Sequence, residues 1–257
     1  LLICTGSSTS NMLYRNLGGN LGFEEWTASA INSETSHYAT NHAIFADYDG
    51  DGDVDLFMAT DVQNVLWRNV GGAGLFERVT GWPFTEGPTT NSNDAAFVDY
   101  DGDGDLDLFV ANGQIGTSTK VPNFLYQNVN GAFKKVTGVP VTSRSELTLA
   151  AAFGDFDNDG DLDLVTVDYL AEHGVFENAV DGEWHLASTG TLVEGAKSSR
   201  GGAWADVDGD GDLDLVVVND GAANELFLNV AGEHKGSEFV LEAASAVSTD
   251  VDVTAGR

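Results

Sequence analysis

Short runs of apolar residues recur along the chain and alternate with turns rich in Gly, Asn and Asp. An aromatic residue lies just before each of four dense acidic stretches, and a strand-like run follows each stretch, as in Leu56–Ala59 and Leu215–Val218. A third kind of run ends at an Asn, as in Asn64–Asn69, and a fourth follows a Gly-containing turn, as in Phe76–Thr80. Runs of this length between turn residues predict four short β-strands per repeat, and no helical periodicity of useful length appears.

The acidic stretches begin at residues 47, 99, 155 and 206, so the intervals between them are 52, 56 and 51 residues. A period of this size is typical of solenoids and propellers, and four antiparallel strands per period describe a propeller blade. We therefore predict an all-β fold, with residues 1–257 forming a single β-propeller, or a segment of one, built of four-stranded antiparallel blades. The predicted repeats cover approximately residues 1–27 (partial), 42–80, 94–137, 150–187 and 201–242, with 243–257 leading into a further blade or closing the ring.

The partial first repeat matches the later strands of a repeat but lacks a first strand and an acidic stretch. Leu1–Cys4 match the run after the stretch, Asn11–Asn16 the third run and Phe23–Thr27 the fourth. Two interpretations follow from this pattern. The chain is a window cut from a longer array, or five blades close with one of them defective.

Composition narrows the class of protein further. Lys and Arg number 11 against 41 Asp and Glu, which gives a formal net charge of −30. Such a charge argues against a nucleic-acid binder and against docking to anionic lipid. A hydrophobic fraction of 42% is too high for a disordered acidic tail, and one Cys excludes an intrachain disulfide framework. No stretch approaches 18 apolar residues, so we expect no membrane insertion by this chain.

About half of the acidic residues lie in the four stretches, each with five Asp at alternate positions of a nine-residue loop. Carboxylates this close repel one another unless a cation neutralises them. Calcium accepts six to eight oxygen ligands in irregular geometry, and the pattern offers side-chain oxygens at positions 1, 3, 5 and 9 and a carbonyl at position 7. Gly at position 6 permits a sharp turn. A β-type run follows instead of a Glu at position 12 and a helix, which argues against an EF-hand. Magnesium and four solvated acidic turns are the weaker alternatives.

The loop D-x-D-G-D-G-D-x-D-L and the continuation N-x-L-[YW]-x-N…F-x-x-V-T resemble the FG-GAP/VCBS repeat family, whose blades also build the head of integrin α subunits. The resemblance implies a β-propeller with about four Ca²⁺ ions, each between the first two strands of a blade. By motif position it implies side-chain ligands at Asp47, Asp49, Asp51, Asp55, Asp99, Asp101, Asp103, Asp107, Asp155, Asp157, Asp159, Asp163, Asp206, Asp208, Asp210 and Asp214. The implied carbonyl ligands are Asp53, Asp105, Asp161 and Asp212.

Other residues give weaker signals. One aromatic position recurs in every repeat and suits either packing or sugar stacking: Tyr14, Trp67, Tyr126, Phe176 and Phe227. We interpret Gly81–Phe84 as an insertion without equivalent in the other repeats, and Trp82 within it as a candidate exposed contact. The histidines occupy unequal repeat positions, which predicts ordinary surface or loop residues, and Cys4 is expected on a buried strand. No nucleophile–base motif is evident, so we predict that the chain is not an enzyme.

The function we predict is that of a calcium-stabilised binding, adhesion or structural module of a larger secreted or surface protein, such as part of an extracellular fibre or appendage. The alternative is a carbohydrate-binding propeller, either a lectin or the accessory domain of a polysaccharide-active enzyme. Expected partners are a protein or glycan ligand on the loop surfaces and other domains or copies of a larger assembly, with no nucleic acid. Millimolar calcium outside cells suits sites of this kind, which predicts an extracellular or cell-surface location.

Overall fold

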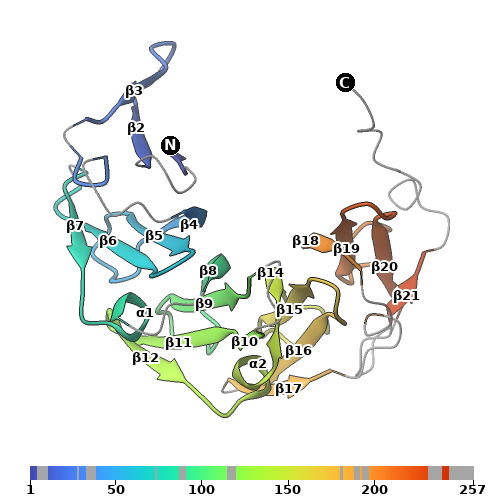
Figure 1. Cartoon of the computed structure of the whole chain (residues 1–257). Coiled ribbons are helices and arrows are strands. Elements are labelled where there is room, and N and C mark those ends of the chain that lie inside the picture. Colours follow the sequence, from blue (N-terminus) through green and yellow to red (C-terminus); the bar gives the residue numbers. More distant parts are fainter. Residues whose placement is uncertain are drawn as a thin grey trace. The chain divides into compact units, whose positions relative to one another are not determined.

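The structure, a computed structural model, describes residues 1–4, 11–27, 29–32, 39–72, 74–86, 91–114, 120–179, 182–187, 192, 197–230 and 239–242 (Figure 1). The chain divides into two compact units. Unit 1 comprises Leu1–Phe97, Asp105–Val110 and Tyr126–Lys135. Unit 2 comprises Val98–Gly104, Ala111–Leu125 and Val136–Arg257. Residues 243–257, for which we predict a further blade or ring closure, lie outside the described residues.

The described residues form an all-β fold with four four-stranded sheets, in each of which the strands follow chain order. The pairings β4 to β7, β14 to β17 and β18 to β21 are antiparallel. The first two sheets contain β4 (Thr40–Ala46), β5 (Asp55–Thr60), β6 (Val65–Asn69) and β7 (Phe76–Val79), and β8 (Ser92–Val98), β9 (Asp107–Asn112), β11 (Phe124–Val129) and β12 (Ala132–Val136). The other two contain β14 (Thr148–Gly154), β15 (Asp163–Asp168), β16 (Gly174–Ala179) and β17 (Glu183–Leu186), and β18 (Ser199–Ala205), β19 (Asp214–Asn219), β20 (Glu225–Asn229) and β21 (Phe239–Leu241).

In three of the four sheets, the second strand is the most deeply buried. Every residue of β5, β9 and β15 is buried, on both faces of the sheet. This explains why these strands read as continuous apolar runs in the sequence, whereas a strand with one solvated face alternates between apolar and polar residues. Each of these strands begins with the last Asp of an acidic loop. The packing of the strand in the core therefore fixes the position of that end of the loop.

The N-terminal segment of unit 1 folds as a three-stranded antiparallel sheet of β1 (Leu2–Ile3), β2 (Met12–Asn16) and β3 (Phe23–Glu25). Three strands therefore lie where the sequence predicts the later strands of a repeat, and the assignment of this segment to a partial repeat stays a prediction. Leu13 and Ile31 pack in one core cluster with residues of β5 and β6, including Leu56 and Trp67. Cys4 follows β1 and is exposed, so the expectation of a buried thiol was wrong, because β1 ends one residue earlier.

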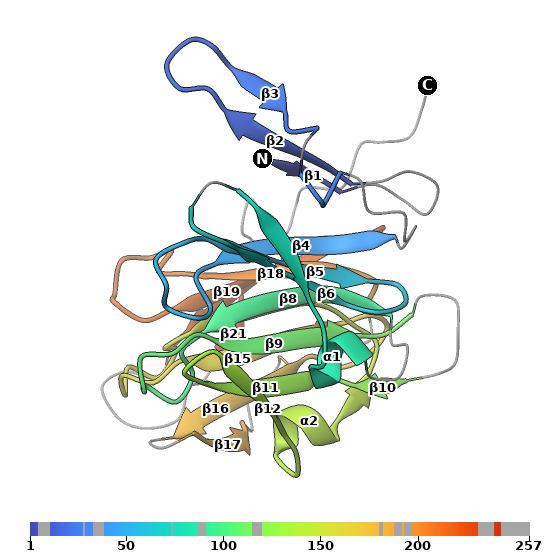
Figure 2. The same cartoon turned by 90° about the vertical axis from the view of Figure 1, so that its left-hand side faces the viewer.

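Unit 2 contains a core shared by two consecutive sheets. Val165, Val167 and Val175 of one sheet pack with Leu215 and Val217 of the next. The innermost strands β14 and β18 contact each other along this core. Figure 2 shows the strands of the sheets from the side.

The helices among the described residues are two four-residue turns, α1 (Pro83–Glu86) and α2 (Pro140–Ser143), each opened by a Pro. Two short strands, β10 (Val121–Pro122) and β13 (Ser145–Glu146), pair with each other. No helix in the described part of the chain is long and apolar enough to span a membrane.

Candidate metal centre

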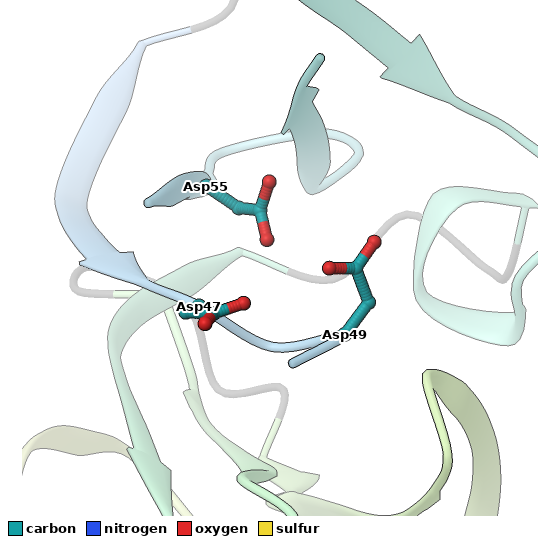
Figure 3. Close-up of side chains that lie close together, drawn as sticks. All are labelled: Asp47, Asp49 and Asp55. Carbon is teal, nitrogen blue, oxygen red and sulfur yellow. The ribbon is translucent and has the colours of Figure 1, made fainter. Parts of the chain in front are cut away.

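The first acidic loop brings three carboxylates together between β4 and β5. Asp47 follows the end of β4, Asp49 lies two residues further on, and Asp55 opens β5. Figure 3 shows the three side chains converging from the loop and the strand. One carboxylate oxygen of each lies within 4.8 Å of those of the other two. The trio occupies positions 1, 3 and 9 of the loop.

Within unit 2, the third loop repeats this trio with Asp155, Asp157 and Asp163 between β14 and β15. The second loop, residues 99–107, is divided between the two units after Gly104. Within unit 2 the Gly104 N–H donates to Asp99 Oδ2 at 3.0 Å, and within unit 1 the Asn128 N–H donates to Asp107 Oδ1 at 2.7 Å.

The fourth loop, between β18 and β19, differs. Its grouped carboxylates are Asp206, Asp208 and Asp210, which are positions 1, 3 and 5, and all three residues are exposed. Asp214 at position 9 is fully buried but is not part of this group. In the first, third and fourth loops, the structure thus brings together three of the four predicted side-chain positions, and the third member is position 9 in the first and third loops but position 5 in the fourth.

The loops turn sharply because two positions adopt left-handed backbone conformations. Position 6 has φ between 90° and 99° in all four loops, at Gly52, Gly104, Gly160 and Gly211. Position 4 also has positive φ and is Gly in three loops but Asn158, with φ 59°, in the third. Gly and Asn tolerate this region best. The sequence interpretation identified position 6 and missed position 4, although the repeated D-G-D-G carries the signal.

Backbone N–H groups hold the carboxylates of positions 1 and 3. In the first loop, Asp51 N–H and Gly52 N–H donate to the two oxygens of Asp47, at 3.1 and 3.0 Å, and Asp51 N–H also lies 3.4 Å from Asp49 Oδ1. The third loop repeats all three contacts. A carboxylate oxygen has about two acceptor sites, so these bonds orient the trio and leave lone pairs for a cation.

Position 5 serves the turn itself. Its carboxylate accepts the N–H of position 7 at 2.9–3.0 Å in three loops, from Asp53 to Asp51, from Asp161 to Asp159 and from Asp212 to Asp210. The contact occurs both in the first and third loops, where position 5 lies outside the trio, and in the fourth loop, where Asp210 belongs to it, so the contact alone does not decide membership. The carbonyl role of position 7 stays a prediction.

Position 9 closes the loop from within the core. Asp55 is fully buried, and its two oxygens accept the N–H of Tyr48 at 3.3 Å and of Asn69 at 2.7 Å. Asp163 and Asp214 make the same pair of bonds in their own loops. A buried carboxylate therefore ties position 2 of the loop to the end of the third strand, a structural role that the sequence interpretation did not assign.

The electrostatics of the trio favour a bound cation. Burial raises the pKa of Asp55 to about 6 and that of Asp163 to about 8, in spite of the backbone N–H groups that favour their charged forms. Burial, followed by repulsion from Asp159, raises the pKa of Asp157 to about 6. Carboxyl groups in this state are costly to ionise unless an opposite charge lies beside them.

The donor set fits calcium. At a Ca²⁺–oxygen distance of about 2.3–2.6 Å, two ligands of one ion lie at most about 5 Å apart, and the oxygens of each trio lie within 4.8 Å of one another. All donors are oxygens, as hard cations prefer. In the second loop, Asp99 Oδ1 is buried and has no hydrogen-bond partner among the described residues. A cation would satisfy that oxygen.

The Asn that ends the third strand links neighbouring sheets at the loops. The side-chain Nδ2 of Asn229 donates to Phe156 O of the preceding loop at 2.7 Å and lies 3.4 Å from Leu213 O of its own. Asn178 bonds Tyr100 O and Leu162 O in the same way, and Asn128 bonds Tyr48 O and Leu106 O. The sequence shows this Asn in every repeat, but only the fold reveals that it reaches the previous loop.

A contact between Ser199 and His173 lies at the end of the sheets that is opposite the acidic loops, and its role is structural. His173 Nδ1 accepts the Asp168 N–H at 3.2 Å, so its Nε2 carries the proton and faces Ser199 Oγ at 3.3 Å. Burial lowers the pKa of His173 to about 4, which keeps the ring neutral. Both side chains are buried, and this tautomer cannot take a proton from the hydroxyl. His173 lies in the loop between β15 and β16, which is one of the two predicted settings, but it is buried and not at the surface.

The recurring aromatic position packs in the core. Trp67, Tyr126, Phe176 and Phe227 are each at most 3% exposed, which decides for packing over sugar stacking at these four residues. Trp82 is different, because it is partly exposed. It is not in a unique insertion, however: Gly81–Phe84 leads into α1 as Gly138–Val141 leads into α2, and Val139 is its counterpart.

Trp82 lines a pocket of about 540 Å³ in unit 1, beside the first acidic loop. Arg68, Glu77 and Arg78 of β6 and β7 form one wall, and Tyr48 and Asp49 of the loop form another. The turn Asn130–Gly131 completes the lining, and Gly131 approaches Asp49 so closely that an added Cβ would lie 3.1 Å from the Asp49 Cβ. The pocket thus shares Asp49 with the first carboxylate trio.

Comparison with protein families matches the FG-GAP-like repeat to residues 47–110 and 99–166. No curated protein matches the sequence. Among solved structures, the chain is similar to an Agrocybe aegerita lectin that recognises non-reducing terminal N-acetylglucosamine, with a TM-score of 0.55 and 17% identity over 93% of this chain and 64% of the lectin. It is also similar to a putative exo-β-1,3-galactanase from Bifidobacterium bifidum s17, with a TM-score of 0.51 and 9% identity over 96% of this chain and 88% of the other.

A third structure, the V. cholerae biofilm matrix protein Bap1, aligns with a TM-score of 0.48 and 16% identity over 93% of this chain and 34% of that protein. The chain thus spans less than two thirds of the lectin and of the biofilm protein. At this level of identity, the lectin and the galactanase inform the fold alone. The family match agrees with the acidic loops described above and confirms the resemblance seen in the sequence. Residues 47–166 of the chain are therefore FG-GAP-like repeats.

Proposed function

We propose that this chain is a calcium-stabilised binding or adhesion module, with its sheets arranged as blades of a β-propeller, within a larger secreted or surface protein. The observation that carries the proposal is the carboxylate trio of the acidic loops. In the first and third loops, backbone N–H groups hold the position-1 carboxylate, and the carboxylate oxygens of the trio lie close enough together to bind one cation. Calcium, when bound, supplies the positive charge that offsets repulsion among these carboxylates.

Asp47, Asp49 and Asp55 would hold the ion of the first loop, Asp155, Asp157 and Asp163 that of the third, and Asp206, Asp208 and Asp210 that of the fourth. Because position 9 opens the second strand and position 1 follows the first, an occupied loop would join the two strands that bury the core. Calcium affinities of order 10⁻⁴–10⁻³ M are common in extracellular modules, which supports an extracellular location and a structural part in a fibre or appendage.

Thermal unfolding with and without calcium tests this proposal. With calcium at about a hundredfold excess over Kd, each site should add about 2.7 kcal/mol of stability, so we expect a melting temperature many degrees higher than in EDTA. Magnesium at the same concentration is the matched control and should shift the melting temperature less, because it needs small octahedral sites and retains its waters. Equal melting curves in calcium and in EDTA would overturn the proposal.

The pocket beside the first loop favours carbohydrate binding as a second candidate function. It combines an aromatic ring, two guanidinium groups and two carboxylates, which is the mixture of stacking and hydrogen-bonding groups that sugars use. We propose a binding role and no catalytic one, since the serine–histidine pair described above is buried and has the wrong tautomer for a general base.

A further inference from the structure

We infer that the pocket lined by Trp82, Arg68, Arg78, Glu77, Tyr48 and Asp49 binds the end of a neutral saccharide. This inference deepens the second candidate function by assigning its site and ligand class. The volume, about 540 Å³, lies within the range of about 300–1,000 Å³ that small-molecule sites occupy.

The charges that face the pocket point to a neutral ligand. Two arginines, Arg68 and Arg78, and two carboxylates line the pocket, and Arg68 pairs with Glu77 at 3.6 Å. Vicinal hydroxyls can both donate to a carboxylate and accept from a guanidinium, so a sugar satisfies both signs at once. A polyanionic ligand would gain from the arginines but would face the two pocket carboxylates and a chain of net charge −30.

The apolar part of the pocket is Trp82 and Val79. The Trp82 ring meets the buried Phe133 ring edge to face, with centroids 6.1 Å apart and an interplanar angle of 90°. Phe133 in turn packs with Tyr48 and Phe84, so a buried aromatic cluster supports the indole from below. A ring held in this way offers an apolar surface to the C–H face of a pyranose without further loss of side-chain entropy.

Corresponding residues in the next repeat supply matched variants. Val139 stands where Trp82 does, and Gln127 stands where Arg68 does. Trp82→Val and Arg68→Gln therefore introduce side chains that the chain already uses at those places. The exposed Arg200 of unit 2, paired with Asp220 at 2.7 Å, gives the control variant Arg200→Gln.

The test is calorimetric titration of the whole chain, in saturating calcium, with three neutral probes: cellotetraose, a β-1,3-galactose trimer and triacetylchitotriose. An α-1,4-galacturonate trimer is the charged counterpart. We expect saturable binding of at least one neutral probe, a loss of about tenfold or more in Trp82→Val and in Arg68→Gln, and no change in Arg200→Gln. Arg68 is exposed, so its variant keeps the test valid if Trp82→Val unfolds.

Two results overturn the inference. One is the absence of binding by every neutral probe, and the other is tighter binding of the galacturonate trimer than of all neutral probes. The melting temperature is measured in calcium and in EDTA on the same samples. This measurement distinguishes a failure of the saccharide-binding inference from a failure of the proposal that calcium stabilises the fold. A calcium-dependent rise without sugar binding removes only the pocket assignment.

Discussion

The third and fourth acidic loops lie in the same unit and share the spacing of their Asp residues, yet they group different carboxylates. The third groups positions 1, 3 and 9 with the core-facing Asp163, and the fourth groups the exposed positions 1, 3 and 5. Phe156 at position 2 of the third loop is 2% exposed, whereas Val207 at the same place in the fourth is 47% exposed. The two loops therefore differ more in the residues that surround them than in their own sequences.

The surroundings of the third loop come from the following sheet. Asn229 Nδ2 donates to the carbonyl of Phe156, and the Phe156 ring packs against Trp204 and Phe239. Asn158 Nδ2 also donates to the Asp212 carboxylate at 2.7 Å. No following sheet meets the fourth loop within the residues that the structure describes. We infer that each sheet shapes the cation site of the sheet before it, and the predictions below test this comparison.

The largest effect should come from Asp163→Ala. This change removes a proposed cation ligand and two buried hydrogen bonds to a carboxylate, from Phe156 N–H and Asn178 N–H. Bonds of this kind contribute about 1.5–3 kcal/mol each, so we expect a loss of about 3 kcal/mol or more in the free energy of unfolding, measured by urea denaturation in calcium. The surface change Asp220→Ala is the control and should stay within about 0.5 kcal/mol of the parent. A similarly small loss in Asp163→Ala would contradict the anchoring role of position 9.

The pH dependence of the calcium-free protein should be the next largest effect. The folded pKa of Asp163 is about 8, well above the unfolded value of about 3.9, so its stabilising contribution is present at low pH and is lost as the pH rises through about 8. In EDTA we expect the melting temperature to fall between about pH 6.5 and 8.5. His173 does not interfere, because its lowered pKa confines its own titration effect to below about pH 6.5.

Calcium should flatten this slope, because the bound charge favours the ionised carboxylate. Asp163→Asn should reduce the slope in EDTA as well, since the amide does not titrate. His42, whose pKa is raised mainly by its hydrogen bond with Asp94, keeps its own loss of stability with rising pH in this variant. An undiminished slope in Asp163→Asn would assign the pH dependence to other groups.

Much of the architecture was predictable from the sequence, because the apolar runs and turn residues are local signals. The strands, including the three N-terminal ones, and the acidic loops all follow from spacing. The role of Asp163 was not predictable, since one of its N–H donors, Phe156, lies in the acidic loop and the other, Asn178, lies on β16. Asn229 shows the same limit: its position in the repeat is evident, but its partner Phe156 lies 73 residues earlier. Trp82 looked unique because its counterpart Val139 shares little side-chain chemistry with it.

Asn229→Ala tests the link between sheets directly. Truncation leaves the Phe156 carbonyl without its side-chain donor, which should cost about 1–2 kcal/mol and loosen the third loop. We expect weaker calcium binding at one site in a calorimetric titration. Asn69→Ala is the matched control, because among the described residues the Asn69 side chain bonds within its own sheet, to Val54 O and from Gly74 N–H. If both variants lower the calcium affinity of one site equally, the hydrogen bond from Asn229 to the preceding loop does not explain the loss of affinity.

The smallest effect on calcium binding should come from Asp159→Asn and Asp210→Asn, the matching changes at position 5 of the third and fourth loops. This pair of changes is also the most specific test of the comparison between these loops. In both loops the Asn oxygen can still accept the position-7 N–H that Asp159 or Asp210 accepts now, so the turn is kept and only the charge is removed. Because Asp210 belongs to the carboxylate trio of the fourth loop and Asp159 lies outside that of the third, Asp210→Asn should weaken calcium binding severalfold more than Asp159→Asn. Titration of each variant with calcium, followed by calorimetry, measures the difference. Equal losses would mean that both loops use position 5 alike once loaded, and that the neighbouring sheet does not select the ligands.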